Sequence, residues 1–121
     1  MAQILVVDDS STVRNEVGDF LKSNGLDVAF AIDGRDGLGK IKADPALKLV
    51  ICDVNMPNMD GLTMAEKVRS ELKNSSVNII MLTTENSPAM KERGKAAGIK
   101  GWIVKPFNGP AVIGSLKKMM A

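Results

Sequence analysis

Histidine is absent from this sequence of 121 residues, and cysteine occurs only once, as Cys52. The lack of histidine excludes a Ser-His-Asp or Cys-His catalytic site, the usual histidine-bearing zinc sites and a phosphohistidine formed on this chain. A single cysteine excludes an internal disulfide and a structural zinc site, and it is typical of a protein from a reducing compartment. Any chemistry must therefore come from carboxylates, hydroxyls and lysines.

Long hydrophobic runs and a strong excess of one charge are also missing. No apolar segment approaches the ~20 residues of a membrane span, and the N-terminal sequence lacks a basic leader with a cleavage site. We therefore expect a cytoplasmic protein without a membrane span. The net charge of +2 is too small to indicate nucleic-acid binding. Residues 1–60 hold 10 acidic and 6 basic side chains and residues 61–121 hold 4 and 10, which predicts separate acidic and basic regions.

Five short apolar runs are present instead, and they predict strands. They cover residues 4–7, 28–32, 47–52, 77–82 and 101–104. Most are continuous rather than alternating, as in strands that are covered on both faces.

Helical patterns lie between these runs. In the first pattern, Ser10 or Ser11 is expected to cap the helix and Gly25 to end it. The second pattern, at Leu38 and Ile41, includes two glycines that each cost a helix ~1 kcal/mol. The other three patterns begin near Leu62, at Ser87-Pro88 and at Gly109-Pro110.

This order of elements is (βα)5. Alternating strands and helices predict a parallel sheet with right-handed crossovers. Five strands in one α/β domain fit an open, doubly wound sheet of flavodoxin-like order 2-1-3-4-5 better than an eight-fold barrel. We expect residues 1–121 to form a single domain.

Reactive side chains follow four of the five predicted strands. Asp8-Asp9 follow the first, Asp53 the third, Thr83-Thr84-Glu85 the fourth and Lys105-Pro106 the fifth. In the order 2-1-3-4-5 these strands are neighbours, so their carboxyl ends converge on one spot. Two carboxylates ~4 Å apart repel by about 4 kcal/mol at an effective dielectric of 20, and a divalent cation such as Mg²⁺ would relieve the repulsion.

This set of groups is suited to phosphoryl transfer. A metal ion, Lys105 and Thr83 would hold the phosphoryl oxygens while a carboxylate attacks in line. Asp53 is the expected nucleophile because its strand is central in the proposed order. Asp9 is the expected direct metal ligand, and Asp8 is expected to hold metal-bound water.

The chain resembles the receiver domain of bacterial two-component response regulators over its whole length. The resemblance is carried by Val6-Val7-Asp8-Asp9-Ser10, by the run from Asp53 to Leu62, by Thr83 and by Lys105-Pro106-Phe107. The run Asn-Met-Pro-Asn-Met-Asp-Gly-Leu and the absence of an output domain make it most similar to stand-alone chemotaxis regulators of the CheY type, whose fold has the strand order given above.

The resemblance implies a phosphorylation-activated switch. Asp53 would accept a phosphoryl group from a histidine kinase, and Mg²⁺ would be bound by Asp9, Asp53 and the backbone carbonyl of Asn55, with Asp8 helping through water. Thr83 would move toward the phosphoryl group and Lys105 would pair with it.

Further residues acquire expected roles from the same resemblance. The Lys105–Pro106 bond would be cis. Trp102 would change rotamer with Thr83 and alter the surface formed by the fourth helix, fifth strand and fifth helix. Asn55 and Glu85 would tune hydrolysis.

Two positions depart from the family pattern. Trp102 stands where Tyr, Phe or His is usual, and its indole N–H needs a partner. Thr84 stands where Ala or Gly is common, and its β-branched side chain is expected to screen the acyl phosphate from water.

The expected partners are proteins. They are a histidine kinase as phosphodonor and a downstream target such as a flagellar motor switch protein or a phosphatase. The basic residues Lys91, Arg93, Lys95 and Lys100 are either a solvated face or a dock for an acidic partner segment. We expect a monomer.

Three alternative functions make different demands on the sequence. A phosphorelay or phosphate-sink receiver outside chemotaxis would share the same site. An aspartate-nucleophile phosphohydrolase would need a second carboxylate where Asn55 stands, and a cap over its substrate. A flavin carrier would need a phosphate loop where Asp8-Asp9 stand and aromatic platforms, although only four aromatic residues are present.

Overall fold

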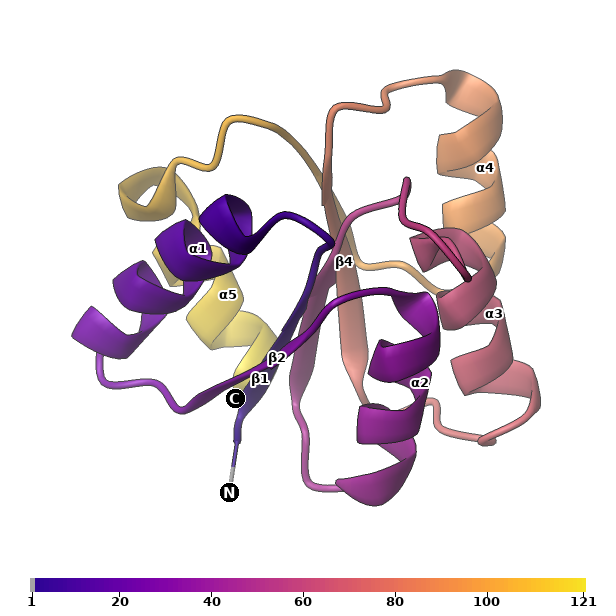
Figure 1. The fold of residues 1–121 in the computed structure, drawn as a ribbon, viewed down its shortest axis with the longest axis horizontal. Coiled ribbons are helices and arrows are strands. Elements are labelled where there is room, and N and C mark those ends of the chain that lie inside the picture. Colours follow the sequence, from indigo (N-terminus) through magenta and orange to yellow (C-terminus); the bar gives the residue numbers. More distant parts are fainter. Residues whose placement is uncertain (1) are drawn as a thin grey trace.

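The computed structural model describes residues 2–121, in which five parallel strands form one sheet flanked by helices (Figure 1). The strands lie in the order β2-β1-β3-β4-β5, which confirms the predicted flavodoxin-like (βα)5 fold. Val7 is in register with Cys52, and Cys52 with Met81, so the carboxyl ends of β1, β3 and β4 meet at one edge. The strand bounds are β1 (Ile4–Val7), β2 (Val28–Ala31), β3 (Leu49–Cys52), β4 (Asn78–Thr83) and β5 (Gly101–Val104).

The helices cover both faces of the sheet. In Figure 1, α1 and α5 lie on one side and α2, α3 and α4 on the other. Alternate residues of β1 separate the two cores: Ile4 and Val6 pack toward α1 and α5, whereas Leu5 and Val7 pack toward α2 and α3. None of the helices within residues 2–121 is long and apolar enough to span a membrane. The helix bounds are α1 (Ser11–Ser23), α2 (Gly34–Ala43), α3 (Gly61–Ser70), α4 (Pro88–Ala96) and α5 (Gly109–Met120).

The helix ends follow the expected signals. Ser10, rather than Ser11, caps α1, and its hydroxyl accepts a hydrogen bond from the Val13 N–H at 3.3 Å. Gly25 and Gly98 follow α1 and α4 with φ angles of +81° and +79°, a backbone conformation that side chains with a Cβ disfavour.

The second helix forms despite its glycines. A Cβ at Gly37 would lie 2.8 Å from the Met64 sulfur and 3.1 Å from the nearest Val7 methyl. The missing side chain therefore lets α2 pack closely against α3 and β1, and this tertiary packing offsets the low helix propensity of glycine.

The predicted strand runs and the observed strands differ at their ends. Ile32, which is 56% exposed, lies outside β2 because its N–H donates to the Asp36 carboxylate at 3.0 Å rather than to a neighbouring strand. Val77 precedes β4 because its N–H donates to the Asn74 side chain at 3.1 Å. Leu47 likewise precedes β3, because its N–H donates a hydrogen bond to the Asp44 carbonyl at 3.2 Å. Local turn bonds thus replace the sheet ladder at these positions.

Candidate functional site

The predicted reactive residues meet at the carboxyl edge of the sheet. Backbone hydrogen bonds fix the segments that carry them: Asp8 N–H donates to Ala31 O at 3.1 Å, and Asp53 N–H donates to Val7 O at 3.1 Å. Lys105 N–H donates to Thr83 O at 2.9 Å. These bonds continue the strand ladder by one residue, so each reactive side chain starts from a rigid strand end.

Lys105 joins two of the carboxylates. Its ammonium lies 3.1 Å from Asp8 Oδ2 and 3.0 Å from Asp53 Oδ2. Asp8 and Asp53 are only 2% and 8% exposed, whereas Asp9 is exposed. The second oxygen of Asp8 accepts the Ser10 N–H at 2.9 Å, so the first residues of α1 also hold this carboxylate.

Burial and hydrogen bonding act in opposite directions on the pKa values of Asp8 and Lys105. Loss of hydration raises the pKa of Asp8 above its ordinary value, although the Ser10 N–H and the Lys105 ammonium oppose the rise. Burial alone would lower the pKa of Lys105, but its hydrogen bonds to Asp53 and Asp8 raise it, so the lysine stays charged. Burial also raises the pKa of the Cys52 thiol, which therefore stays protonated and packs as a small buried hydrophobe.

The three carboxylates can hold a metal ion. One oxygen each from Asp8, Asp9 and Asp53 lie within 4.8 Å of one another. With Lys105 the group carries a net charge of −2, and its ligand atoms are all oxygen. Hard divalent cations such as Mg²⁺ bind this kind of donor set, so the residues fit the expected cofactor.

A second set of contacts surrounds Glu85, which follows β4. The Asn55 amide donates to the Glu85 carboxylate at 2.7 Å, and the Thr83 hydroxyl, which is fully buried, accepts the Glu85 N–H at 3.2 Å. The indole N–H of Trp102 donates to the Glu85 carbonyl at 2.8 Å. The partner required by the indole is therefore a backbone atom of the β4–α4 loop.

Comparison of the sequence with known protein families identifies one family that spans nearly the whole chain. The family described as "Response regulator receiver domain" matches residues 4–117. The chain belongs to this family. Its members are phosphorylation-activated switches of two-component signalling rather than classical enzymes, and the chain is a receiver of this kind.

Several similar relatives are named as chemotaxis proteins. The receiver is 42% identical to chemotaxis protein CheY1 of Helicobacter pylori over 106 residues. The aligned segment covers 87% of this chain and 86% of that protein. It is 38% identical over 113 residues to chemotaxis protein CheY of Treponema pallidum, with 92% and 77% covered.

Solved structures agree with this assignment. Chemotaxis protein CheY4 of Vibrio cholerae superposes with a TM-score of 0.88 at 41% identity, covering 98% of each chain. A complex of CheX, CheY, BeF3 and Mg²⁺ from Borrelia burgdorferi contains a chain that superposes with a TM-score of 0.89 at 26% identity, covering 99% of this chain and 90% of that one.

Two predicted residues of the receiver lie at the margin of the site. Thr84 is exposed and contributes to a groove of about 420 Å³ between α1 and the loop after β5. Pro106 lines the same groove, and its peptide bond with Lys105 is cis as the resemblance implied. The other lining residues are Thr12, Val13, Glu16, Leu82, Lys105 and Phe107.

Sequence reasoning missed two supports of the receiver site. The Arg14 guanidinium donates to the backbone carbonyl of Asp8 at 2.6 Å, which ties the first carboxylate to α1. Gly61 packs so closely on the end of β3 that a Cβ there would lie 2.0 Å from Asp53 O. The sequence Asp60-Gly61 could have indicated the start of a helix, since Asp60 is the N-cap of α3, but nothing in the sequence marked Arg14.

Proposed function

We propose that Asp53 accepts a phosphoryl group from the phosphohistidine of a histidine kinase and that this event switches a protein-binding surface. The observation that carries the proposal is the grouping of Asp8, Asp9 and Asp53 with the Lys105 ammonium at one strand edge. Asp53 is the preferred acceptor because β3 lies between β1 and β4, at the centre of the group.

In the proposed step, a carboxylate oxygen of Asp53 attacks the phosphorus atom. An O–P bond forms while the N–P bond of the phosphohistidine breaks, and the kinase imidazole leaves with the electron pair and takes up a proton. The Lys105 ammonium, 3.0 Å from Asp53 Oδ2, is near enough to pair with a phosphoryl oxygen. Thr83 offers a hydroxyl from the next strand for another oxygen.

The proposed cofactor is Mg²⁺. Asp9, Asp53 and the backbone carbonyl of Asn55 would hold it directly, and Asp8 would hold it through water. When bound, it supplies positive charge for the phosphoryl oxygens and offsets the repulsion among the carboxylates. The presence of Mg²⁺ in the complex of the similar Borrelia protein supports this assignment.

Glu85 connects the proposed phosphoryl site with the proposed output surface. Its contacts with Asn55 and Thr83 face the site, and its carbonyl binds Trp102 on β5. Movement of Thr83 toward a phosphoryl oxygen would disturb the Glu85 N–H bond and so change the surroundings of the indole. Asn55 and Glu85 also flank the acceptor, where they would tune hydrolysis, and Thr84 would limit the access of water.

The proposed output is binding of a protein in chemotaxis. Lys91, Lys95 and Lys100 line a shallow hollow beside Trp102, and Val104 of β5 is 44% exposed. Such a basic and partly apolar face suits an acidic, amphipathic segment of a motor switch protein or a phosphatase. The CheX complex of the Borrelia protein supports a protein partner of this general kind.

Phosphorylation by a small phosphodonor tests the proposal. Acetyl phosphate and Mg²⁺ should add one phosphoryl group to the intact chain, located at Asp53 by mass spectrometry, and should change Trp102 fluorescence. Asp53→Asn should abolish both signals, because the amide is not a nucleophile of comparable strength. Asp44→Asn is the matched control, since Asp44 ends α2 far from the site.

Each outcome bears on a separate part of the proposal. A phosphoryl group on another side chain would contradict the role of Asp53. Phosphorylation that does not need a divalent cation would contradict the role of Mg²⁺. Phosphorylation without a change in Trp102 fluorescence would contradict the connection through Glu85.

A further inference from the structure

The loop between β3 and α3 is held at its tip by the junction of β2 and α2. The Asn58 amide donates to Asp33 Oδ2 at 2.7 Å, and Gly34 N–H donates to Met59 O at 3.0 Å. The first of these bonds joins residues 25 positions apart in the sequence. We call this pair of bonds the loop latch.

Asp33 is well suited to act as the fixed side of the latch. It is 5% exposed, and its Oδ1 accepts the Asp36 N–H at 2.8 Å as the N-cap of α2. Hydrogen bonds from Asp36 and Asn58 stabilise the ionised form, so the pKa of Asp33 lies below its ordinary value. Both carboxylate oxygens are therefore occupied, and a helix terminus holds the side chain in place.

The backbone on both sides of the latch is adapted to it. Asn58 has a φ of +66°, in the left-handed region that Asn and Gly tolerate. A Cβ at Gly34 would lie only 2.4 Å from Met59 O, so the junction requires glycine to approach the loop. These features indicate a built contact rather than a chance encounter of two surface side chains.

The latch complements a second bond at the base of the loop. Gly61 N–H donates to Val54 O at 2.9 Å, which closes the segment directly behind Asp53. Asn55 lies between the base bond and the latched tip. The two attachments together restrict the segment that carries the proposed backbone ligand.

We propose that Asp33 and Asn58 are positioning residues that preorganise the Asn55 segment for Mg²⁺. This inference rests on the proposed function, because it takes the Asn55 carbonyl as a ligand. Mg²⁺ demands a nearly ideal octahedral arrangement, so a ligand on a mobile loop must first be ordered at the expense of binding free energy. The latch orders the loop in advance and thereby raises affinity without contacting the ion.

Asn58→Gly is the main test, because glycine accepts the left-handed backbone but cannot donate to Asp33. The Kd for Mg²⁺, measured by calorimetry, should rise about three- to tenfold, as expected when one hydrogen bond no longer supports the site. In the absence of Mg²⁺, amide hydrogen exchange at residues 54–60 should become faster. Saturating Mg²⁺ should restore the rate of phosphorylation by acetyl phosphate.

Asp33→Ser is a second variant that keeps an N-cap residue on α2 but removes the carboxylate that Asn58 reaches. It should weaken Mg²⁺ binding by a similar factor. Asn24→Gly is the control: its amide donates to Phe20 O at 2.9 Å at the opposite end of α1, so its loss should leave the Kd unchanged.

The outcomes separate this inference from the proposed function. Normal Mg²⁺ affinity in both latch variants would overturn the inference and leave the proposed function intact. A Kd raised equally by Asn24→Gly would also overturn it, because the effect would then reflect general loss of stability. Failure of the unaltered chain to bind Mg²⁺ would overturn both.

Discussion

The neighbouring helices α3 and α4 are held in the molecule by different forces. α3 buries Gly61, Leu62, Met64, Ala65 and Val68, whereas the buried residue of α4 is Gly94. A shift of α3 would disturb the apolar core, but a shift of α4 would disturb few apolar contacts.

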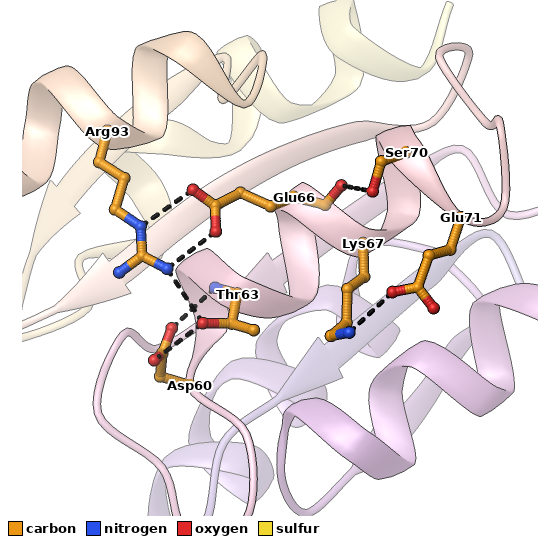
Figure 2. A network of polar contacts seen from close by, with 7 residues as sticks. All are labelled: Asp60, Thr63, Glu66, Lys67, Ser70, Glu71 and Arg93. Atoms are coloured by element: carbon orange, nitrogen blue, oxygen red, sulfur yellow. Dashed lines mark hydrogen bonds and ion pairs between the residues drawn. The ribbon is translucent and has the colours of Figure 1, made fainter.

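Polar contacts hold α4 against α3 instead. Figure 2 shows the Arg93 guanidinium bound to both oxygens of Glu66, at 2.9 and 2.8 Å, and to the Thr63 hydroxyl at 3.0 Å. Thr63 in turn binds Asp60, the N-cap of α3. At the other end of α4, Arg69 of α3 donates to Ala97 O at 3.2 Å.

The comparison indicates which part of the receiver can change position at low cost. Exposed ion pairs typically contribute less than about 1 kcal/mol, whereas each large buried apolar side chain contributes ~1.5–3 kcal/mol. The β4–α4 loop, with Thr84 and Glu85, leads into the loosely packed helix. Asp53, the proposed phosphoacceptor, lies against the firmly packed helix α3 through Gly61. A rigid acceptor beside a movable helix is a suitable arrangement for a switch.

The largest expected effect is that of Leu62→Ala in α3. Leu62 is 1% exposed, and its truncation should lower the free energy of unfolding by about 2–5 kcal/mol in urea denaturation. Met90→Ala, which truncates a half-buried side chain of α4, should have a distinctly smaller effect. Equal losses would show that the two helices are packed with similar strength.

Arg69→Ala should have an intermediate effect. The guanidinium also donates to Asn74 O at 3.0 Å and Val77 O at 2.8 Å, so its removal leaves several part-buried carbonyls without this donor. We expect a loss of about 1–3 kcal/mol in unfolding free energy, and faster amide exchange near the C-terminal end of α4.

Arg69→Lys should recover only part of this loss, because a single ammonium cannot reproduce the planar fork of donors. Lys67→Ala is the matched control on the same helix, since Lys67 pairs only with exposed Glu71 at 2.7 Å. Full recovery by lysine would mean that positive charge alone, rather than the geometry of the donors, stabilises this junction.

The smallest expected effect is that of Glu66→Gln. The side chains of Arg93 and Glu66 are 45% and 43% exposed, so the loss in unfolding free energy should stay below about 1 kcal/mol and shrink at 1 M salt. The Arg93 hydrogen bond lowers the pKa of Glu66 below 4.5. The stabilisation is therefore fully present above pH 4.5 and is lost as the pH falls through the lowered value.

Urea denaturation of wild type and Glu66→Gln as a function of pH and salt measures this contribution. Glu71→Gln is the control, because Glu71, the C-cap of α3, pairs with Lys67 of the same helix rather than with α4. A difference between wild type and Glu66→Gln that persists in acid and in high salt would indicate a packing effect instead of an ion pair.

Much of the proposed site could be predicted because topology is restrictive. Continuous apolar runs and helical spacing indicated a parallel (βα)5 sheet, and such a sheet brings the carboxyl ends of neighbouring strands to one edge. Asp8, Asp53 and Lys105 meet there with direct contacts, as expected from their positions after β1, β3 and β5. Their grouping can be predicted without any knowledge of how the side chains pack.

The loop latch and the α3–α4 contacts could not be predicted in the same way. Asn58 and Asp33 are 25 residues apart, and Arg93 and Glu66 are 27 apart. Neither spacing follows a helix or strand period. Whether these side chains meet depends on how closely each helix packs on the sheet. The partner of Trp102 is a backbone carbonyl, which has no sequence signal at all.

The order of strands and helices, the edge at which the acidic and basic groups gather and the chemistry available there all follow from the sequence, because short-range periodicity and the rules of parallel sheets determine them. The tertiary structure decided which oxygen accepts from which donor, how firmly each loop is attached and which helix remains loosely packed. These features arise from contacts between distant segments, whose distances are set by side-chain volume and close approach at positions such as Gly34, Gly37 and Gly61.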